Sequence, residues 1–166
     1  MNAIDLLIAQ HRSLESKFED LLAATDNGGS AGRRQALLAE AGDDLAVHIA
    51  SEELVFYPAV KARRTEDILL ESLEEHLSLK RLLSDLMALP ATAETFRPKA
   101  KVLQEQTEHH HKEEENHLFP KVRTLLDEAE LERLGEEMLR LQTQLRAEGD
   151  PRTNVPAEQD AAAPLP

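Results

Sequence analysis

The sequence predicts an all-α protein, an antiparallel up-down four-helix bundle with an additional C-terminal helix. Leu, Ala and Glu, which favour helices, dominate the 166 residues, and only six glycines interrupt them. Apolar residues recur at the alternating spacing of three and four that marks the buried face of a helix. Short connections separate these segments, and short connections favour antiparallel neighbours in a bundle.

The first hairpin of the bundle is predicted from two segments. The first segment runs from about residue 3 to residue 24 and stops at DNGG, residues 26–29, because glycine favours helix termination. The second segment runs from about residue 31 to residue 64. We therefore expect a pair of antiparallel helices joined by a glycine-rich loop.

A second hairpin and a further helix follow. The third segment begins near Thr65, a candidate N-cap, and ends at Leu89-Pro90, because a residue before proline disfavours the helical conformation. The fourth segment covers residues 95–126. A fifth helix is predicted over residues 128–147, which completes the helical part of the chain.

The helical part and the C-terminal tail differ in composition. The helical part has the length of one domain with a core of its own. From Gly149 the sequence reads GDPRTNVPAEQDAAAPLP, which is rich in Pro and Ala and has no periodic apolar face. The sequence therefore predicts a helical bundle domain over residues 1–148 and a disordered tail over residues 149–166.

The composition argues against several classes of function. The chain has 19 basic and 32 acidic residues, a net charge of −13, so we expect no nucleic-acid partner and no anionic membrane surface. It has no cysteine, which excludes disulfides, thiol catalysis and iron–sulfur ligation by this sequence. Neither a signal peptide nor a run of about 20 apolar residues is present, and we expect a cytoplasmic protein.

The two hairpins repeat one arrangement of polar residues. In each hairpin, the first helix has one histidine on its apolar face. The second helix has a histidine on its apolar face and a glutamate four residues later. The fourth segment repeats the second at an offset of 62 residues, and the third repeats the first at an offset of 65. The residues are His11, His48 and Glu52 in the first hairpin and His76, His110 and Glu114 in the second.

This arrangement predicts a metal site inside the bundle. A buried carboxylate costs on the order of several kcal/mol of desolvation, and two facing carboxylates also repel each other. A bound cation relieves both costs, and neutral imidazoles complete its ligand set. Six protein groups are too many for one catalytic zinc ion, but they suit two metals if both glutamates bridge them.

The donor types predict which metals fit. Mixed imidazole and carboxylate ligands suit iron, with manganese or zinc as competitors, and the absence of thiolates disfavours copper(I). Each of two six-coordinate irons would have two imidazoles and two carboxylate oxygens, which leaves two positions. One position could hold a bridging oxo or hydroxo group, and the other could take a small ligand.

The neighbouring polar residues are predicted to have other roles. His117 lies on the apolar face one turn beyond Glu114, and it could be a ligand, a group behind the ligands or a lining residue. Tyr57 is expected to pack in the core, and Pro58 and Pro120 are expected to kink or end their helices. Five further residues lie off the apolar faces and are expected at the surface: Glu53, His109, His111, Glu113 and Glu115.

The doubled pattern, followed by FYP at 56–58 and LFP at 118–120, resembles the hemerythrin-like HHE cation-binding family. The resemblance covers residues 1 to about 146, with all six motif positions in order. It implies an up-down four-helix bundle around a non-heme di-iron centre. Carried over position by position, it implies terminal ligands at His11, His48, His76 and His110 and bridging carboxylates at Glu52 and Glu114.

Two positions differ from the oxygen-carrying hemerythrins of this family. Those proteins have a second histidine one turn before the third-helix ligand, where this chain has Ser72. They also have an aspartate five residues after the last histidine ligand, whereas this chain has Glu114, four residues after His110. The pattern is more similar to the branch that includes iron-centre repair proteins and iron- or oxygen-sensing domains, although this sequence lacks the cysteine-bearing domain of the repair proteins.

These observations support several hypotheses about function. The first is a protein whose di-iron centre binds or reacts with oxygen, nitric oxide or peroxide. A second is an enzyme that disproportionates peroxide or reduces nitric oxide, with His117 as the proton donor. A third is iron storage, donation or sensing, in which the metal controls the fold. The last is a structural or interaction protein without a metal, and no feature names a protein partner.

Overall fold

The computed structural model describes residues 1–166 and confirms the predicted all-α class, with helices and no strand. None of the helices combines the length and the apolar character needed to cross a membrane. The elements are α1 (Ala3–Asp26), α2 (Ala31–Ser51), the π-helical turn η1 (Glu52–Phe56), α3 (Tyr57–Val60), α4 (Glu66–Ala88), α5 (Phe96–Glu113), the π-helical turn η2 (Glu114–Leu118), α6 (Phe119–Leu125), α7 (Glu128–Ala147) and the 3-10 helix η3 (Pro151–Glu158).

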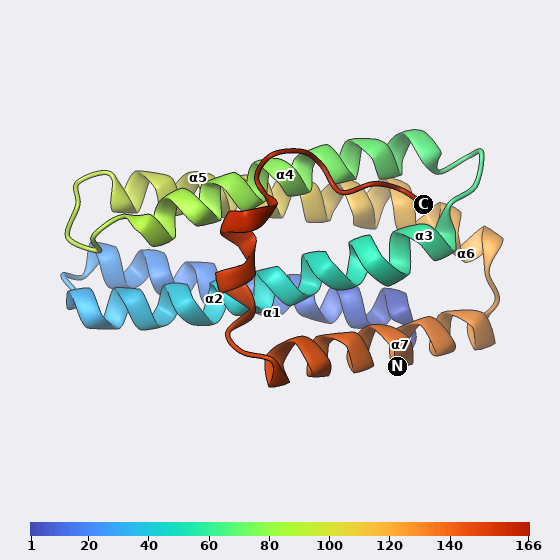
Figure 1. Cartoon of the computed structure of the whole chain (residues 1–166), viewed down its shortest axis with the longest axis horizontal. Coiled ribbons are helices and arrows are strands. Elements are labelled where there is room, and N and C mark those ends of the chain that lie inside the picture. Colours follow the sequence, from blue (N-terminus) through green and yellow to red (C-terminus); the bar gives the residue numbers. More distant parts are fainter.

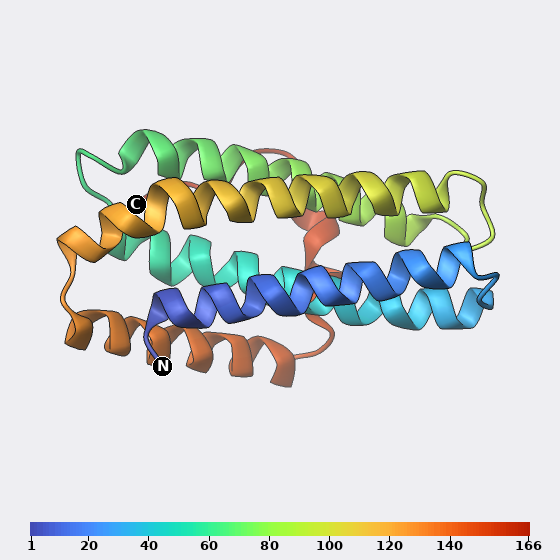
Figure 2. The same cartoon turned by 180° about the vertical axis from the view of Figure 1, so that it is seen from behind.

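Four long helical segments form the bundle, and α7 is the additional helix (Figure 1). α2 continues through η1 into α3, and α5 continues through η2 into α6. α1 packs against α2 and α5, and α4 packs against α5. α7 lies along α1 and α2 on the outside of the bundle, as both views show (Figures 1 and 2). The two hairpins therefore face each other, and their apolar faces meet inside.

Side chains at the helix starts explain where several helices begin. Asn2 and Ser30 accept hydrogen bonds from the backbone of the first turns of α1 and α2. Asp127 and Glu130 form a capping box at the start of α7. Thr65 precedes α4, as predicted, but its hydroxyl bonds to the backbone of the preceding turn rather than to α4.

Two apolar clusters fill the bundle, and a polar layer lies between them. The first cluster, which includes Leu14 and Phe18, lies toward the loops between α1 and α2 and between α4 and α5. The second, which includes Ile4 and Phe56, lies toward the opposite end. Along α1, the buried side chain of His11 lies between the residues of the two clusters. Polar groups in this layer are shielded from water and need partners within the protein or a bound group.

The π-helical turns shift the buried face of two helices by one residue. In a regular α-helix, the face that carries Glu114 would continue to His117. The wider turn of η2 contains one extra residue, so Leu118 and Phe119 are buried and His117 points outward. η1 has the same effect and turns Tyr57 into the core. The proline after each π turn lies in the first turn of α3 or α6, where the missing N–H is tolerated.

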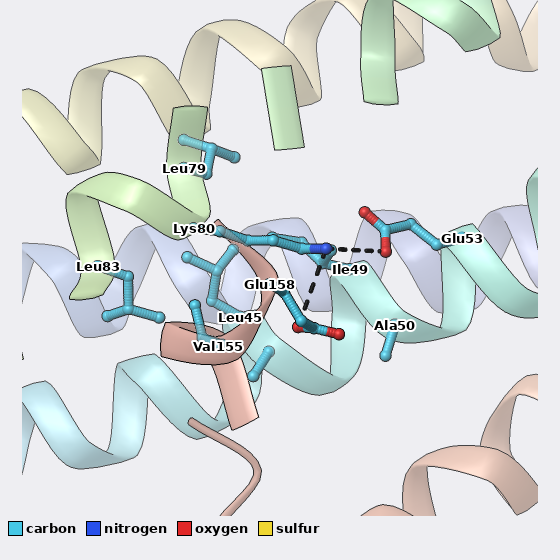
Figure 3. A pocket seen from close by; sticks show the side chains of 10 residues that line it. Leu45, Ile49, Ala50, Glu53, Leu79, Lys80, Leu83, Val155 and Glu158 are labelled. Carbon is cyan, nitrogen blue, oxygen red and sulfur yellow. Dashed lines mark hydrogen bonds and ion pairs between the residues drawn. The ribbon is translucent and has the colours of Figure 1, made fainter. Parts of the chain in front are cut away.

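The tail differs from the predicted disorder. Residues Pro151–Glu158 form η3, which crosses α2 and α4 (Figure 1). Its Val155 is only 3% exposed. Val155 packs in the first apolar cluster with Leu45 (Figure 3). Arg152 fixes the segment through its side chain, which donates to Asp43 at 2.8 Å. Buried Pro151 and Val155 and the ion pair of Arg152 therefore help to order a segment that has no periodic apolar face.

Candidate metal centre

The structure brings the six predicted metal-binding residues together in the polar layer. Each of the six is at most 1% exposed. The two glutamates are the first residues of the two π turns, an irregularity that is frequent at functional sites. The elements supply them as follows: His11 from α1, His48 from α2, Glu52 from η1, His76 from α4, His110 from α5 and Glu114 from η2.

The ligand atoms form two groups that share a carboxylate. Glu52 places Oε1 3.3 Å from Nε2 of His48 and Oε2 3.1 Å from Nε2 of His76. One carboxylate therefore reaches an imidazole in each group. We call the two groups subsite 1, with His11 and His48, and subsite 2, with His76 and His110.

The second carboxylate spans the same two subsites. Glu114 places Oε2 3.3 Å from Nε2 of His11 in subsite 1. Its other oxygen, Oε1, lies 3.7 Å from Nε2 of His110 in subsite 2. Each carboxylate thus has one oxygen directed to each subsite, which is the arrangement that two bridged cations need.

Each of the four histidines in subsites 1 and 2 donates a hydrogen bond from the N–H of its outer ring nitrogen, Nδ1, to an acceptor oxygen. A carboxylate or amide oxygen only accepts, so Nδ1 carries a hydrogen. A neutral imidazole held in this way has its lone pair on Nε2, which faces the centre, as in most metal-ligating histidines. The acceptors are Glu115 for His11 at 2.7 Å, Gln10 for His48 at 2.9 Å, Glu53 for His76 at 3.1 Å and Glu75 for His110 at 3.1 Å.

Several inward-facing atoms have no hydrogen-bond partner. They are Nε2 of His11 and of His48, both carboxylate oxygens of Glu52, and Oε2 of Glu114. An unpaired buried polar group costs on the order of 1–3 kcal/mol, and more if it is charged. Neutral nitrogen donors and anionic oxygen donors gathered in this way fit divalent cations. The residues present therefore fit the metals that the sequence predicts.

Two of the acceptors overturn an expectation from the sequence. Glu53 and Glu115 are predicted at the surface, but Glu53 is buried and Glu115 is partly buried. Each directly follows one of the two central glutamates, Glu52 or Glu114, and accepts a hydrogen bond from a histidine of the other hairpin. Glu113 is exposed, as predicted. The Glu-Glu pair that recurs at the offset of 62 residues is the signal in the sequence that could have identified these two acceptors.

A further layer of residues holds the acceptors in place. Lys80, buried in α4, donates to Glu53 at 3.0 Å and lies 3.9 Å from Glu158 of η3 (Figure 3). Gln10 donates at 2.8 Å to Gln142, which lies on α7. The two elements outside the four-helix bundle, α7 and η3, are therefore connected to the metal centre through these polar contacts.

Burial and charge pairing set the protonation of the centre. Burial raises the pKa of Glu114, but His110 and the other imidazoles outweigh it, so this carboxyl pKa lies well below its usual range. Burial lowers the pKa of His76, but hydrogen bonds to Glu52 and Glu53 raise it to about 9. In the metal-free protein, a proton on His76 therefore compensates the buried carboxylates.

Tyr57 belongs to the centre, although the sequence predicts only a packing role for it. Its buried hydroxyl donates to Oε1 of Glu114 at 2.6 Å and lies 3.3 Å from Nε2 of His76. Burial, with the nearby Glu114 and Glu52, raises the pKa of Tyr57 well above its usual value, so the hydroxyl keeps its proton. At the offset of 62 residues, Phe119 takes this place beside subsite 1 and has no hydroxyl.

The three remaining histidines lie in different environments. His109 is exposed, as predicted. His117 has a 61% exposed side chain that lies 3.7 Å from Glu113, so it points away from the centre. His111 is 1% exposed, against the prediction of a surface position, and it stacks on His11 with ring centroids 3.8 Å apart. α5 packs between α1 and α4, so two consecutive histidines can both be buried. His111 faces His11 of α1, and His110 faces His76 of α4.

Comparisons with known proteins agree with this fold. Residues 2–122 match the family described as Hemerythrin HHE cation binding domain. The crystal structure of a hemerythrin HHE cation binding domain-containing protein from Mycobacterium kansasii superimposes with a TM-score of 0.76 and 23% identity, covering 98% of this chain and 97% of that one. A protein of Nostoc sp. described as a DNA nickase is 27% identical over 137 residues, which are 82% of this chain and 38% of that protein.

The chain thus spans about two fifths of the length of its curated Nostoc relative. The family match covers most of the chain and includes every residue of subsites 1 and 2. The fold of the M. kansasii protein agrees with this match. This chain therefore belongs to the hemerythrin HHE cation-binding domain family, and its buried His/Glu cluster is one that can hold metal.

Proposed function

We propose that this protein holds two iron ions in the bundle and that this di-iron centre binds or reacts with oxygen, nitric oxide or peroxide. The observation that carries the proposal is that each buried carboxylate reaches one imidazole in each subsite. Glu52, for example, spans His48 and His76 at 3.3 and 3.1 Å. One cation in each subsite would share both carboxylates as bridges, and the pair would neutralise their charge.

The donor set supports iron as the metal. Imidazole and carboxylate together suit iron, with manganese and zinc as competitors, and the chain has no thiolate to favour softer metals. Two adjacent irons supply reversible electron transfer to a small ligand, which zinc does not.

The chain's own residues control water and protons around the ligand. Leu14, Leu45 and Leu79 are at most 1% exposed and belong to the first apolar cluster, so they keep bulk water from the centre. The Tyr57 hydroxyl donates to Glu114 on the side of subsite 2, within reach of a ligand there. Tyr57 therefore replaces the outward-facing His117 as the proton donor that we propose.

The Tyr57 hydroxyl also supports a second candidate, an enzyme that disproportionates peroxide or reduces nitric oxide. Peroxide disproportionation gives water and oxygen without outside electrons, whereas two nitric oxide molecules need two electrons and two protons to give nitrous oxide and water, so that reaction turns over only with an added electron donor. Both reactions require proton transfer at the oxygen atoms of the ligand, and a buried hydroxyl with a raised pKa remains protonated for that step. Repeated turnover, rather than saturable binding, distinguishes this candidate from a ligand-binding protein.

The activity named for the Nostoc relative is not part of the proposal. That protein is described as a DNA nickase, and this chain covers 38% of it. A net charge of −13 opposes contact with a phosphate backbone.

The test is a ligand titration of the iron-loaded protein, prepared without oxygen. Nitric oxide, peroxide and oxygen are added to separate samples, and the near-ultraviolet and visible spectra are recorded. We expect spectral changes that saturate near one ligand per iron pair and that are absent from a zinc-loaded control. An iron-loaded protein whose spectrum responds to none of the three ligands would contradict the proposal.

A further inference from the structure

Thr107 on α5 is buried, and its hydroxyl has no hydrogen-bond partner. The residue is 1% exposed, so the hydroxyl cannot bond to bulk water. A threonine inside a helix can satisfy its hydroxyl at the carbonyl four residues earlier, as Thr143 does with Leu139 at 2.8 Å. Thr107 makes no such bond. A buried hydroxyl without a partner is unfavourable, and a bound group that accepts its hydrogen would remove the penalty.

Thr107 belongs to a layer of side chains that lies one turn from the histidines of subsites 1 and 2. Each member is three residues from the histidine of its own helix, on the side of the first apolar cluster. α1 and α4 run toward that cluster and α2 and α5 run away from it, so the member follows the histidine in one pair and precedes it in the other. We call this set the wall layer, and its members, all at most 1% exposed, are Leu14, Leu45, Leu79 and Thr107. Leu45 and Leu79 line one cavity between α2 and α4, so they lie at the same depth (Figure 3).

The position of Thr107 on α5 directs its side chain toward the axis of the bundle. An α-helix turns about 100° per residue, so Thr107 lies about 60° from His110 on one side and about 40° from His111 on the other. His110 faces His76 of α4, and His111 faces His11 of α1. A side chain between these two directions points between α4 and α1, into the bundle.

The two carboxylates approach the histidines from the side opposite to the wall layer. Glu52 and Glu114 each follow the histidine of their helix by four residues. Farther along the same helices come Phe56 and Leu118, which belong to the second apolar cluster. The wall layer is therefore the side of the histidines without a carboxylate, and the Thr107 hydroxyl is its one polar group.

We propose that the Thr107 hydroxyl donates a hydrogen bond to the small ligand of the di-iron centre. This inference rests on the proposed di-iron function. The three leucines of the wall layer offer no hydrogen bond, so Thr107 orients the ligand within an otherwise apolar wall. A hydrogen bond to a charged acceptor is stronger than one to a neutral acceptor. The hydroxyl therefore favours small anions, such as azide or deprotonated peroxide.

The first test is azide binding to the oxidised, iron-loaded protein, measured from its visible charge-transfer band. Thr107→Val keeps the shape of the side chain and removes the hydroxyl, so we expect azide to bind about tenfold more weakly. Thr107→Ser keeps the hydroxyl and should bind azide within about threefold of the wild type. The iron content should be the same in all three proteins.

The infrared stretching band of bound azide reports the hydrogen bond itself. In the wild type and in Thr107→Ser, the band should move when exchangeable hydrogens are replaced by deuterium, because the hydroxyl hydrogen touches the azide. The isotope shift should be absent from Thr107→Val.

The metal-free protein gives a readout that does not depend on iron. If the hydroxyl has no partner within the fold, Thr107→Val removes an unpaired polar group and should move the midpoint of denaturant unfolding to a higher concentration. Ser84→Ala is the matched control, because the Ser84 hydroxyl on α4 is also buried and unpaired. Ser84 lies eight residues from His76, about 12 Å along the helix, so its loss should leave the azide affinity unchanged.

The outcomes distinguish the two proposals. A wild-type azide affinity or an unchanged isotope shift in Thr107→Val would overturn the role of Thr107 and leave the di-iron function intact. A lower unfolding midpoint, or a failure of Thr107→Val to fold, would have the same consequence, because it would show that the hydroxyl is bonded within the protein. A wild-type protein that holds no iron pair would overturn both proposals.

Discussion

Each histidine of subsites 1 and 2 is held by one acceptor behind it, and Glu53 is the acceptor for His76. The carboxylate fixes the ring orientation and the tautomer that directs Nε2 toward the centre. We expect Glu53→Gln to weaken metal binding about 10- to 100-fold while the fold is retained, measured by chelator competition. Glu113→Gln is the control, because Glu113 is exposed and should leave the affinity unchanged. Equal affinities for both variants would contradict the role of Glu53.

Tyr57 allows a second test at the scale of single residues. Tyr57→Phe removes the hydroxyl that donates to Glu114 and leaves the ring in place. If this hydroxyl delivers protons, the rate of reaction with peroxide should fall about a hundredfold, with the iron content unchanged. His117→Phe should react at the wild-type rate, because that side chain points outward. An unchanged rate in Tyr57→Phe would remove Tyr57 from the proton path.

At the scale of elements, the spacing of apolar residues was sufficient to predict the four-helix bundle and the residue range of α7. The predicted helix over residues 128–147 matches α7, because the Asp127 capping box marks its start. The two π turns were not predictable, because five residues of altered winding leave no periodic mark in the sequence. They place the Tyr57 hydroxyl against Glu114 and turn His117 outward, which explains why the sequence predicted only a packing role for Tyr57 and an inward position for His117.

The repeat also explains which parts of the site the sequence could predict. Glutamate and histidine at recurring offsets are visible without coordinates, so the six central residues could be named and are brought together in the structure. His111 has no counterpart in the first hairpin, where Ile49 occupies the equivalent position, so the repeat offers no signal for it. Its burial follows from the packing of α5 between α1 and α4, which only the three-dimensional structure shows.

η3 is predicted to contribute to stability although it lies outside the bundle. Val155 is 3% exposed in the first apolar cluster, so Val155→Asp would bury a charge or undock the segment. We expect the free energy of unfolding to fall by about 2 kcal/mol in a denaturant titration. Val102→Asp, at a position 40% exposed on α5, should change it by less than about 0.5 kcal/mol. Similar losses in the two variants would indicate that η3 is not docked in solution.

At the scale of the whole molecule, the protonation of the centre couples metal binding to pH. In the metal-free protein the pKa of His76 is about 9, because Glu52 and Glu53 outweigh the effect of burial. Below that pH a metal must displace the proton, so metal affinity should rise with pH up to about 9 and then level off. Chelator competition at several pH values measures this, and an affinity that does not change below pH 9 would contradict it.

The stability of the metal-free fold should depend on pH in the opposite direction. A raised pKa gives stability that is fully present below the ordinary histidine value of 6.5 and is lost as the pH rises toward about 9. Binding of metal removes this dependence on His76, because the cation then compensates the buried carboxylates. We therefore expect the bundle to exchange a proton for a metal at the same place in its core.

The central claim is that two cations share the two bridging carboxylates, and the most direct test is the number of irons per chain. The wild type and a His48→Ala/His110→Ala variant are loaded with iron without oxygen, freed of excess metal and measured by elemental mass spectrometry. The account predicts about two irons per wild-type chain and almost none in the variant, which lacks one imidazole from each subsite. A stably folded wild type that retains no iron, or a variant that retains as much as the wild type, would contradict it.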